Sequence, residues 1–189
     1  MVKERIDDLV DIISETYARL ENTFVIRNNQ QLVKYLENPE TWKRKQLASR
    51  TTYRRQLILE ARRQLTQLNA KTEKVFLLGY KQVDNDAIEI TTNEIVAKDL
   101  PDDAKEKIKE LKNFNLKQIV ELANQSYRAY TTQVRVINDV KEVEEFYNAV
   151  KNQMKKGIEN GIKIAYKNGR MFSWKSYMEM NIRTTLHQE

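Results

Sequence analysis

Residues 42–78 read WKRKQLASRTTYRRQLILEARRQLTQLNAKTEKVFLL and contain neither proline nor glycine. Apolar side chains recur in this stretch among arginine, lysine and glutamine at the three- and four-residue intervals of one helical face. They are Leu47, Tyr53, Leu57, Ala61, Leu65 and Leu68. This pattern predicts a very long, basic helix over residues 42–79.

A second helical pattern fills residues 1–38, before the basic stretch. Its apolar positions keep the i, i+3, i+4 spacing of one helical face, at Ile6, Leu9, Val10, Ile13, Tyr17, Leu20 and Phe24. The pattern weakens at Asn28 and Asn29, which leaves room for a kink, and then resumes. Pro39 disfavours helical geometry in the residue before it, so we predict that the first helix ends at Asn38.

The character of the chain changes between Gly79 and Pro101, where asparagine, aspartate and a short β-branched run over 88–92 replace the helical pattern. We expect an irregular segment near 79–101, because an isolated strand there has nothing to pair with. Helical spacing returns over 102–165, with a break near Asn138, and Asn168–Gly169 is typical of a turn. Ser173 stands where the N-cap of a final helix over 173–189 is expected.

Together these patterns predict an all-α protein, an elongated bundle of long amphipathic helices that forms a single helical domain over 1–189. Hydrophobic residues make up 40% of the chain and charged residues 32%, so each helix offers the core only a narrow stripe. The last helical pattern reaches Glu189 without a stop signal. We therefore expect the chain to be the N-terminal part of a longer protein.

The composition of the chain excludes most classes of catalytic site. The 189 residues include no cysteine and one histidine, His187, which excludes a thiolate nucleophile, a thiolate or His-pair metal site and a Ser–His relay. The longest apolar run, Val75–Leu78, is far too short for a membrane span. The charged N-terminus lacks the apolar region of a secretory signal, which predicts residence in the cytoplasm where the chain is made.

The positive charge is concentrated in the predicted basic helix. The net charge of the whole chain is +6, whereas residues 41–82 carry only Glu60 and Glu73 as acids. Polybasic helices bind phosphate backbones without sequence preference, and Tyr53 within the cluster is a candidate for stacking on bases. The candidate nucleic-acid contacts are Lys43, Arg44, Lys45, Arg50, Arg54, Arg55, Arg62 and Arg63. The alternative is that these side chains line a solvated face or pair with the acidic first and third segments.

The acidic clusters do not predict a catalytic, cofactor or metal site. Neighbouring acids such as Asp102 and Asp103 point about 100° apart on a helix and do not converge. Asp84–Asn85–Asp86 lacks the glycine and the closing glutamate of a calcium loop. No glycine-rich phosphate loop occurs. We therefore predict that these residues are not an enzyme and bind no cofactor.

The C-terminal segment 166–186, YKNGRMFSWKSYMEMNIRTTL, resembles the phage minor capsid protein 2 family. In that family an NGR step is followed by S-x-x-S-Y-x-E and then by R-T. The matching residues here are Asn168, Gly169, Arg170, Ser173, Ser176, Tyr177, Glu179, Arg183 and Thr184, with Trp174 inside the segment. The likeness is specific over these residues, and upstream it extends only to a similar order of helices.

The resemblance implies a minor structural protein of a tailed-phage or prophage head, present in several copies in the virion, in the head interior or at the portal vertex. It implies portal or capsid protein as partner, and DNA contact through residues 43–63 is compatible with it. Two alternatives remain open. One is a dedicated, non-specific nucleic-acid-binding protein, and the other is the N-terminal delivery region of a larger protein with an enzyme domain beyond residue 189.

The motif residues have simple structural roles in this interpretation. Asn168–Gly169 supplies the turn, Ser173 the helix cap, and Trp174 the packing anchor, together with Tyr177. The aromatic residues Tyr166, Phe172, Trp174 and Tyr177 are expected to pack the last helix onto the preceding one. Glu179 and Arg183 stand four residues apart in the favourable order for an intrahelical ion pair. The alternative is that these two side chains and Arg170 present a polar surface to a portal or capsid subunit.

Overall fold

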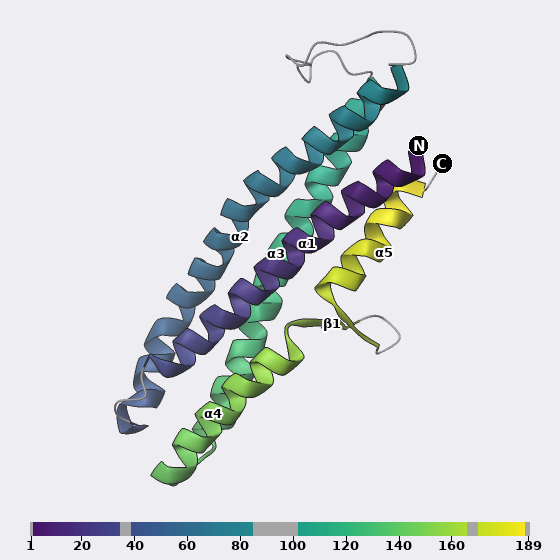
Figure 1. Ribbon diagram of the computed structural model, residues 1–189. Helices are drawn as coiled ribbons and strands as arrows, with labels where there is room; N and C mark the ends of the chain where they lie inside the picture. The colour runs from purple at the N-terminus through teal and green to yellow at the C-terminus, as the bar shows by residue number, and fades with distance from the viewer. Residues whose placement is uncertain (1, 35–38, 85–101, 166–169, 188–189) are drawn as a thin grey trace.

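The computed structural model describes residues 2–34, 39–84, 102–165 and 170–187. Within these ranges the chain forms five helices and one small antiparallel sheet (Figure 1). The elements are α1 (Val2–Val33), α2 (Pro39–Asp84), α3 (Asp102–Asn138), α4 (Val143–Asn160), β1 (Lys163–Ala165), β2 (Met171–Ser173) and α5 (Trp174–His187). The protein is all-α apart from the hairpin, as the helical periodicity predicts.

Three long helices make the body of the bundle. With 46 residues and a rise of about 1.5 Å per residue, α2 is about 69 Å long. It runs beside α3, and α1 packs against both (Figure 1). The core is a continuous cluster of apolar side chains from every helix, including Ile13, Phe24, Leu57, Leu122 and Val150. This arrangement is the elongated bundle that narrow apolar stripes on long helices predict.

The predicted bounds of the first two helices need correction. Helix α1 ends at Val33, and residues 35–38 lie outside the described part of the chain. Helix α2 begins at Pro39, since proline suits the first helical position, where its missing N–H is no loss. It also continues past Gly79 to Asp84, so the irregular segment does not begin at 79. The predicted irregular residues 85–101 lie outside the described residues.

Asn28 and Asn29 do not interrupt α1, because their side chains are buried and bonded to the neighbouring helices. The Nδ2 of Asn28 donates to the backbone oxygen of Ser126 at 3.1 Å, and its Oδ1 accepts from the hydroxyls of Tyr53 and Ser126. The Nδ2 of Asn29 donates to the backbone oxygen of Met154 at 3.4 Å. The weak point of the hydrophobic pattern is therefore a buried polar layer rather than a kink.

One predicted core residue of α2 is on the surface. Leu47 is 69% exposed, while the adjacent Gln46 is fully buried. Gln46 occupies the buried stripe because its Oε1 accepts a hydrogen bond from the hydroxyl of Tyr130. The other predicted positions behave as the periodicity indicates, since Tyr53, Leu57, Ala61 and Leu68 are buried and Leu65 packs against the core.

The segment predicted as helix over 102–165 ends in a strand. Helix α3 ends at Asn138, where the sequence predicts a break, and α4 follows after a short connection. Strand β1 then pairs with β2, with Ile164 opposite Phe172. The hairpin was not predicted, because three-residue strands give no readable alternation. The predicted turn at Asn168–Gly169 lies outside the described residues.

The last helix returns to the beginning of the chain. Helix α5 packs along α1, so that the two labelled ends of the chain are close together (Figure 1). Arg183 of α5 forms an ion pair with Asp7 of α1. Among residues 2–34, 39–84, 102–165 and 170–187, no helix combines the length and the apolar character needed to cross a bilayer.

Candidate nucleic-acid interface and C-terminal motif

The predicted nucleic-acid contacts on α2 do not share one face of the helix. Arg44, Arg55 and Arg62 are exposed, and their spacing of eleven and seven residues places them on a common stripe of the outer surface. Arg63 is exposed and lies 3.8 Å from a carboxylate oxygen of Glu60. Lys45 is also exposed, whereas the side chain of Lys43 is outside the described part of the structure.

The two acids of the basic segment bind cations from the neighbouring helices. Arg27 of α1 donates to Glu60 at 3.0 Å, and Lys112 of α3 lies 2.6 Å from Glu73. In these two ion pairs an acid of α2 binds a cation of another helix. The prediction was the reverse, that cations of α2 pair with acids of the first and third segments. Because Glu60 and Glu73 face α1 and α3, their charges do not offset the arginine stripe of Arg44, Arg55 and Arg62.

Tyr53 is not available for stacking on bases, contrary to the prediction. Only 3% of the residue is exposed, and its hydroxyl donates to Asn28. Burial raises the pKa of its phenol far above the ordinary value, with a further rise from Tyr130. Tyr53 is therefore a neutral core residue, whose ring lies edge-on to that of Tyr130 at a centroid separation of 4.8 Å.

Two further arginines of α2 point toward α3. The Nη2 of Arg54 donates to Oδ1 of Asn124 at 3.3 Å, and its guanidinium lies over the ring of Tyr127, 5.9 Å from the centroid. Arg50 lies one helical turn before Arg54 on the same side. Arg54 is exposed and Arg50 is partly buried, so these two side chains lie at the edge of the contact between α2 and α3.

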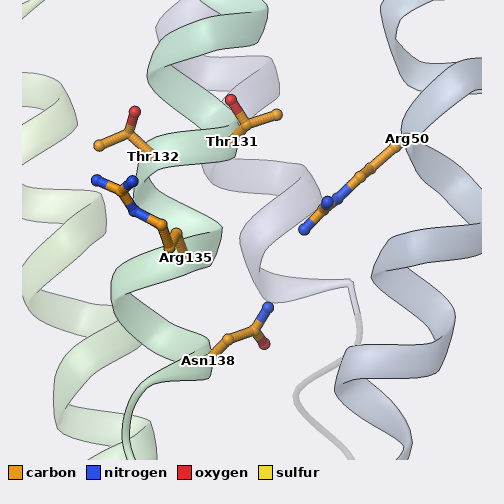
Figure 2. A pocket seen from close by; sticks show the side chains of 5 residues that line it. All are labelled: Arg50, Thr131, Thr132, Arg135 and Asn138. Carbon is orange, nitrogen blue, oxygen red and sulfur yellow. The ribbon is translucent and has the colours of Figure 1, made fainter.

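Arg50 borders a pocket of about 320 Å³ between α2 and α3, which we call the Arg50 pocket (Figure 2). Its other lining residues all belong to the last two turns of α3 and are Thr131, Thr132, Arg135 and Asn138. The Nε of Arg50 and the Oδ1 of Asn138 are buried without a hydrogen-bond partner in the described structure. In Figure 2 Arg50 extends from α2 toward α3, between Thr131 and Asn138, while Arg135 turns toward Thr132.

Sequence reasoning found Arg50 but missed the α3 residues of this pocket. Their only local signal is the polar i, i+4, i+7 spacing of Thr131, Arg135 and Asn138, which places them along one helical face. Such a stripe is ordinary on a solvated helix, and only the pairing of α2 with α3 brings Arg50 to it. The pocket is thus a property of the tertiary structure.

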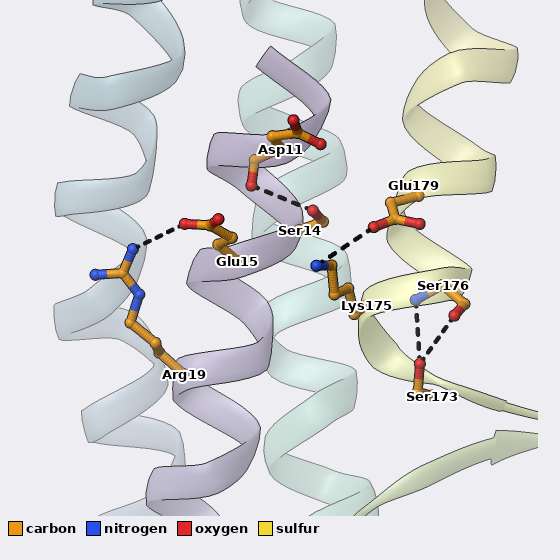
Figure 3. Close-up of polar contacts among 8 residues, drawn as sticks. All are labelled: Asp11, Ser14, Glu15, Arg19, Ser173, Lys175, Ser176 and Glu179. Atoms are coloured by element: carbon orange, nitrogen blue, oxygen red, sulfur yellow. Dashed lines mark hydrogen bonds and ion pairs between the residues drawn. The ribbon is translucent and has the colours of Figure 1, made fainter. Parts of the chain in front are cut away.

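Ser173 caps α5 as predicted (Figure 3). Its Oγ accepts a hydrogen bond from the backbone N–H of Ser176 at 3.2 Å, and it lies 3.0 Å from the Oγ of Ser176. Since α5 begins at Trp174, this is the bond from an N-cap side chain to the third helical N–H. The three-residue spacing of Ser173 and Ser176 in the motif is therefore explained by this helix cap.

Trp174 anchors α5, but on α1 rather than on the preceding helix. It is fully buried, and its ring is stacked on that of Tyr17 with centroids 6.3 Å apart and planes inclined by 7°. Tyr177 lies edge-on to Trp174 at 5.9 Å. Phe172 packs against the core from β2, and Tyr166 is outside the described residues. The predicted packing role is confirmed, and the predicted partner helix is wrong.

The predicted ion pair between Glu179 and Arg183 is replaced by two others. Glu179 lies 3.9 Å from the Nζ of Lys175 within α5 (Figure 3), and Arg183 reaches Asp7 on α1. Arg183 thus fastens α5 to α1 instead of offering a free cation. Arg170 and Thr184 are exposed, and the Thr184 hydroxyl donates to the backbone oxygen of Met180. Asn168 and Gly169 are outside the described residues.

Glu21 of α1 holds the start of the hairpin. Its Oε1 accepts the backbone N–H of Ile162 at 2.8 Å, and the backbone N–H of Trp174 also bonds to this carboxylate. Gly161 has a φ of 60°, and a Cβ there would meet Oε1 of Glu21 at 2.5 Å. A side chain at this position would be strained by the backbone conformation and would displace the Glu21 carboxylate from its place.

Replacement of Glu21 by glutamine is expected to change how stability depends on pH. Burial raises the pKa of Glu21 above its ordinary value, although the N–H groups of Ile162 and Trp174 lower it again. The folded chain then holds this proton more tightly than the unfolded chain, so the group's contribution to stability declines as the pH rises through the raised pKa. Urea unfolding between pH 4 and 7 should show the native chain losing stability relative to Glu21→Gln.

Glu15→Gln is the matched control, since Glu15 is an exposed residue of the same helix, paired with Arg19 at 3.3 Å (Figure 3). Equal pH profiles for the two variants would contradict the assigned role of Glu21.

The described residues contain no group of three or more histidines, aspartates or glutamates placed to hold a metal ion. No protein-family model, curated protein or solved structure matches the chain.

Proposed function

We propose that this chain is a minor capsid protein of a tailed bacteriophage or prophage, a structural component that assembles with portal or capsid protein in several copies. The observation that carries the proposal is the residue-by-residue resemblance of 166–186 to the phage minor capsid protein 2 family. A long helical body without a described metal-binding cluster is compatible with this role.

The motif residues divide into two groups, and this division supports an interface at α5. Ser173 and Trp174 build the helix and hold it on α1. Arg170 and Thr184 are exposed, so the same short segment also presents polar side chains at the surface. A motif that served folding alone would need the first group only.

Co-expression with the portal protein of the same genome tests this proposal. Size-exclusion chromatography with light scattering should show a stoichiometric complex at low salt that persists at high salt, because a docked interface depends less on screened charges than phosphate binding does. Arg170→Glu should weaken the complex, and Arg62→Glu on the outer face of α2 is the charge-matched control. Absence of a complex would contradict the proposal.

The second candidate is a non-specific nucleic-acid-binding protein, and the exposed stripe of Arg44, Arg55 and Arg62 favours it. In the same experiment it predicts nucleic acid eluting with the chain at low salt only, since counterion release makes such binding fall steeply with salt. Contact with packaged DNA as part of a head protein would give both results together.

A further inference from the structure

We propose that the chain forms a symmetric dimer through α4, in which the α4 helices of two copies pack side by side in opposite directions. The contact surface is an apolar stripe made of Val143, Tyr147, Met154 and Ile158, which we call the α4 stripe. The proposal rests on α4 and its borders, and it stands whether or not the chain belongs to a phage head.

The α4 stripe lies on one face of the helix and is exposed. At about 100° per residue, its four members fall within about 60° of one another. Val143 is 59% exposed, Tyr147 44% and Ile158 68%. Met154 is partly buried and packs against the core. Single exposed apolar residues are ordinary, whereas a set on one face is typical of a surface that binds a partner.

The edge of α1 beside α4 adds further apolar surface. Helix α4 packs against α1 and α3 (Figure 1), and Asn29 of α1 donates to the backbone oxygen of Met154. Ile26 and Val33 stand three residues before and four residues after Asn29, so they share its side of α1. They are 57% and 42% exposed. The area that a partner on α4 can cover therefore extends onto α1.

The order of residues in the α4 stripe identifies a second copy as the partner. Val143 and Ile158 are equally far from a midpoint between residues 150 and 151, and so are Tyr147 and Met154. When two copies of α4 run in opposite directions about that midpoint, Val143 of each copy faces Ile158 of the other. Tyr147 then faces Met154, whose sulfur makes favourable contacts with aromatic rings. Such a contact is isologous, because the same surface serves both copies.

The charges beside the α4 stripe are complementary in this arrangement. Glu144 and Lys155 are exposed and flank the stripe on the same side, near opposite ends of α4. In the antiparallel pair, Glu144 of one copy lies within about 3 Å, along the helix axis, of the level of Lys155 of the other. The two-fold axis makes this ion pair twice. Lys155 also lies 3.7 Å from Glu159 in its own helix, and an ammonium group has donors for both carboxylates.

Lys151 opposes the dimer. It is exposed and lies on the same flank as Glu144 and Lys155, beside the midpoint, so the two-fold axis brings it next to its own copy. Like charges placed opposite each other in an interface are unfavourable. A contact that uses mainly one helix from each copy is also at the small end of specific interfaces. We therefore expect a reversible equilibrium between monomer and dimer.

Sedimentation equilibrium of the full chain, over a range of concentrations at fixed salt, measures the dissociation constant of the dimer. Ile158→Glu places a charge in the α4 stripe and should weaken the dimer about tenfold or more, because an unpaired charge is costly to desolvate. Leu47→Glu is the matched control, since Leu47 is 69% exposed on α2, and it should stay within about twofold. Both side chains are on the surface, so both variants are expected to fold.

Three charge variants test the antiparallel register. Glu144→Lys and Lys155→Glu should each weaken the dimer about fivefold, because each places like charges opposite each other at two sites. The double variant exchanges the charges and should return to within about twofold of the native chain. Lys151→Gln should strengthen the dimer about threefold, since it removes the repulsion at the axis.

The proposal is supported if the dimer is weakened by Ile158→Glu, kept by Leu47→Glu and recovered by the double variant. A native chain that stays monomeric at every concentration would overturn it, and so would a dimer that Ile158→Glu leaves intact. Failure of the double variant to recover would show that the two copies of α4 do not pair in this register, which also overturns the proposal. None of these outcomes depends on the complex with portal protein.

Discussion

Replacement of Trp174 by alanine is expected to lower the free energy of unfolding by about 3 to 5 kcal/mol, the range for large aromatic residues deleted from a core. The side chain is fully buried between Tyr17 and Tyr177. Its loss removes the stacked contact that holds α5 on α1 and leaves a cavity between the two helices. Urea denaturation followed by circular dichroism measures the change.

Lys175→Ala is the control for this experiment, because Lys175 is the next residue of α5 and is exposed. It should change stability by less than about 0.5 kcal/mol. A loss of less than 1 kcal/mol in Trp174→Ala would mean that α5 is not anchored by this side chain, and the assignment of the motif tryptophan would be wrong.

Replacement of Asn28 by alanine is expected to cost about 2 to 4 kcal/mol. The side chain serves three groups, namely the Tyr53 hydroxyl, the Ser126 hydroxyl and the backbone oxygen of Ser126. One buried partner left unsatisfied costs about 1 to 3 kcal/mol. The three losses do not add in full, because the backbone oxygen of Ser126 lies inside α3 and keeps its helical hydrogen bond, and the higher helix propensity of alanine returns about 0.6 kcal/mol. Chemical denaturation of both chains at pH 7 measures the difference.

Asn152→Ala makes the same chemical change at an exposed position of α4 and should be neutral or slightly stabilising, because alanine favours the helix. If Asn28→Ala were equally neutral, the polar layer would be accommodated by water. The continuity of α1 through Asn28 and Asn29 would then need another cause.

Local sequence signals predicted the helices because each signal acts within a few residues. The repeat of apolar positions from Val10 to Phe24 identified α1, and the absence of proline and glycine after Trp42 identified α2. The cap at Ser173 was predicted for the same reason, since its bond to Ser176 spans one helical turn. The start of α2 at Pro39 also has a local cause, because proline favours the first position of a helix. The predicted start at Trp42 is three residues too late.

The errors arise where a distant residue decides the local structure. Gln46 replaces Leu47 in the core because Tyr130 offers it a hydrogen bond. Arg183 binds Asp7 rather than Glu179 because α5 lies on α1. The Arg50 pocket was missed for the same reason, since its lining comes from two helices. Such contacts leave no periodic trace in the sequence.

The contact between α5 and α1 also has a kinetic consequence. Asp7 and Arg183 are 176 residues apart in the chain, and ribosomes add about 5 to 20 residues per second. Tyr17 is made 157 residues before Trp174, so the face of α1 that Trp174 covers stays without its native cover for roughly 8 to 31 seconds of synthesis. During that interval Tyr17 and its neighbours on α1 lack their native contacts with α5, so this face of the nascent chain is exposed to non-native contacts.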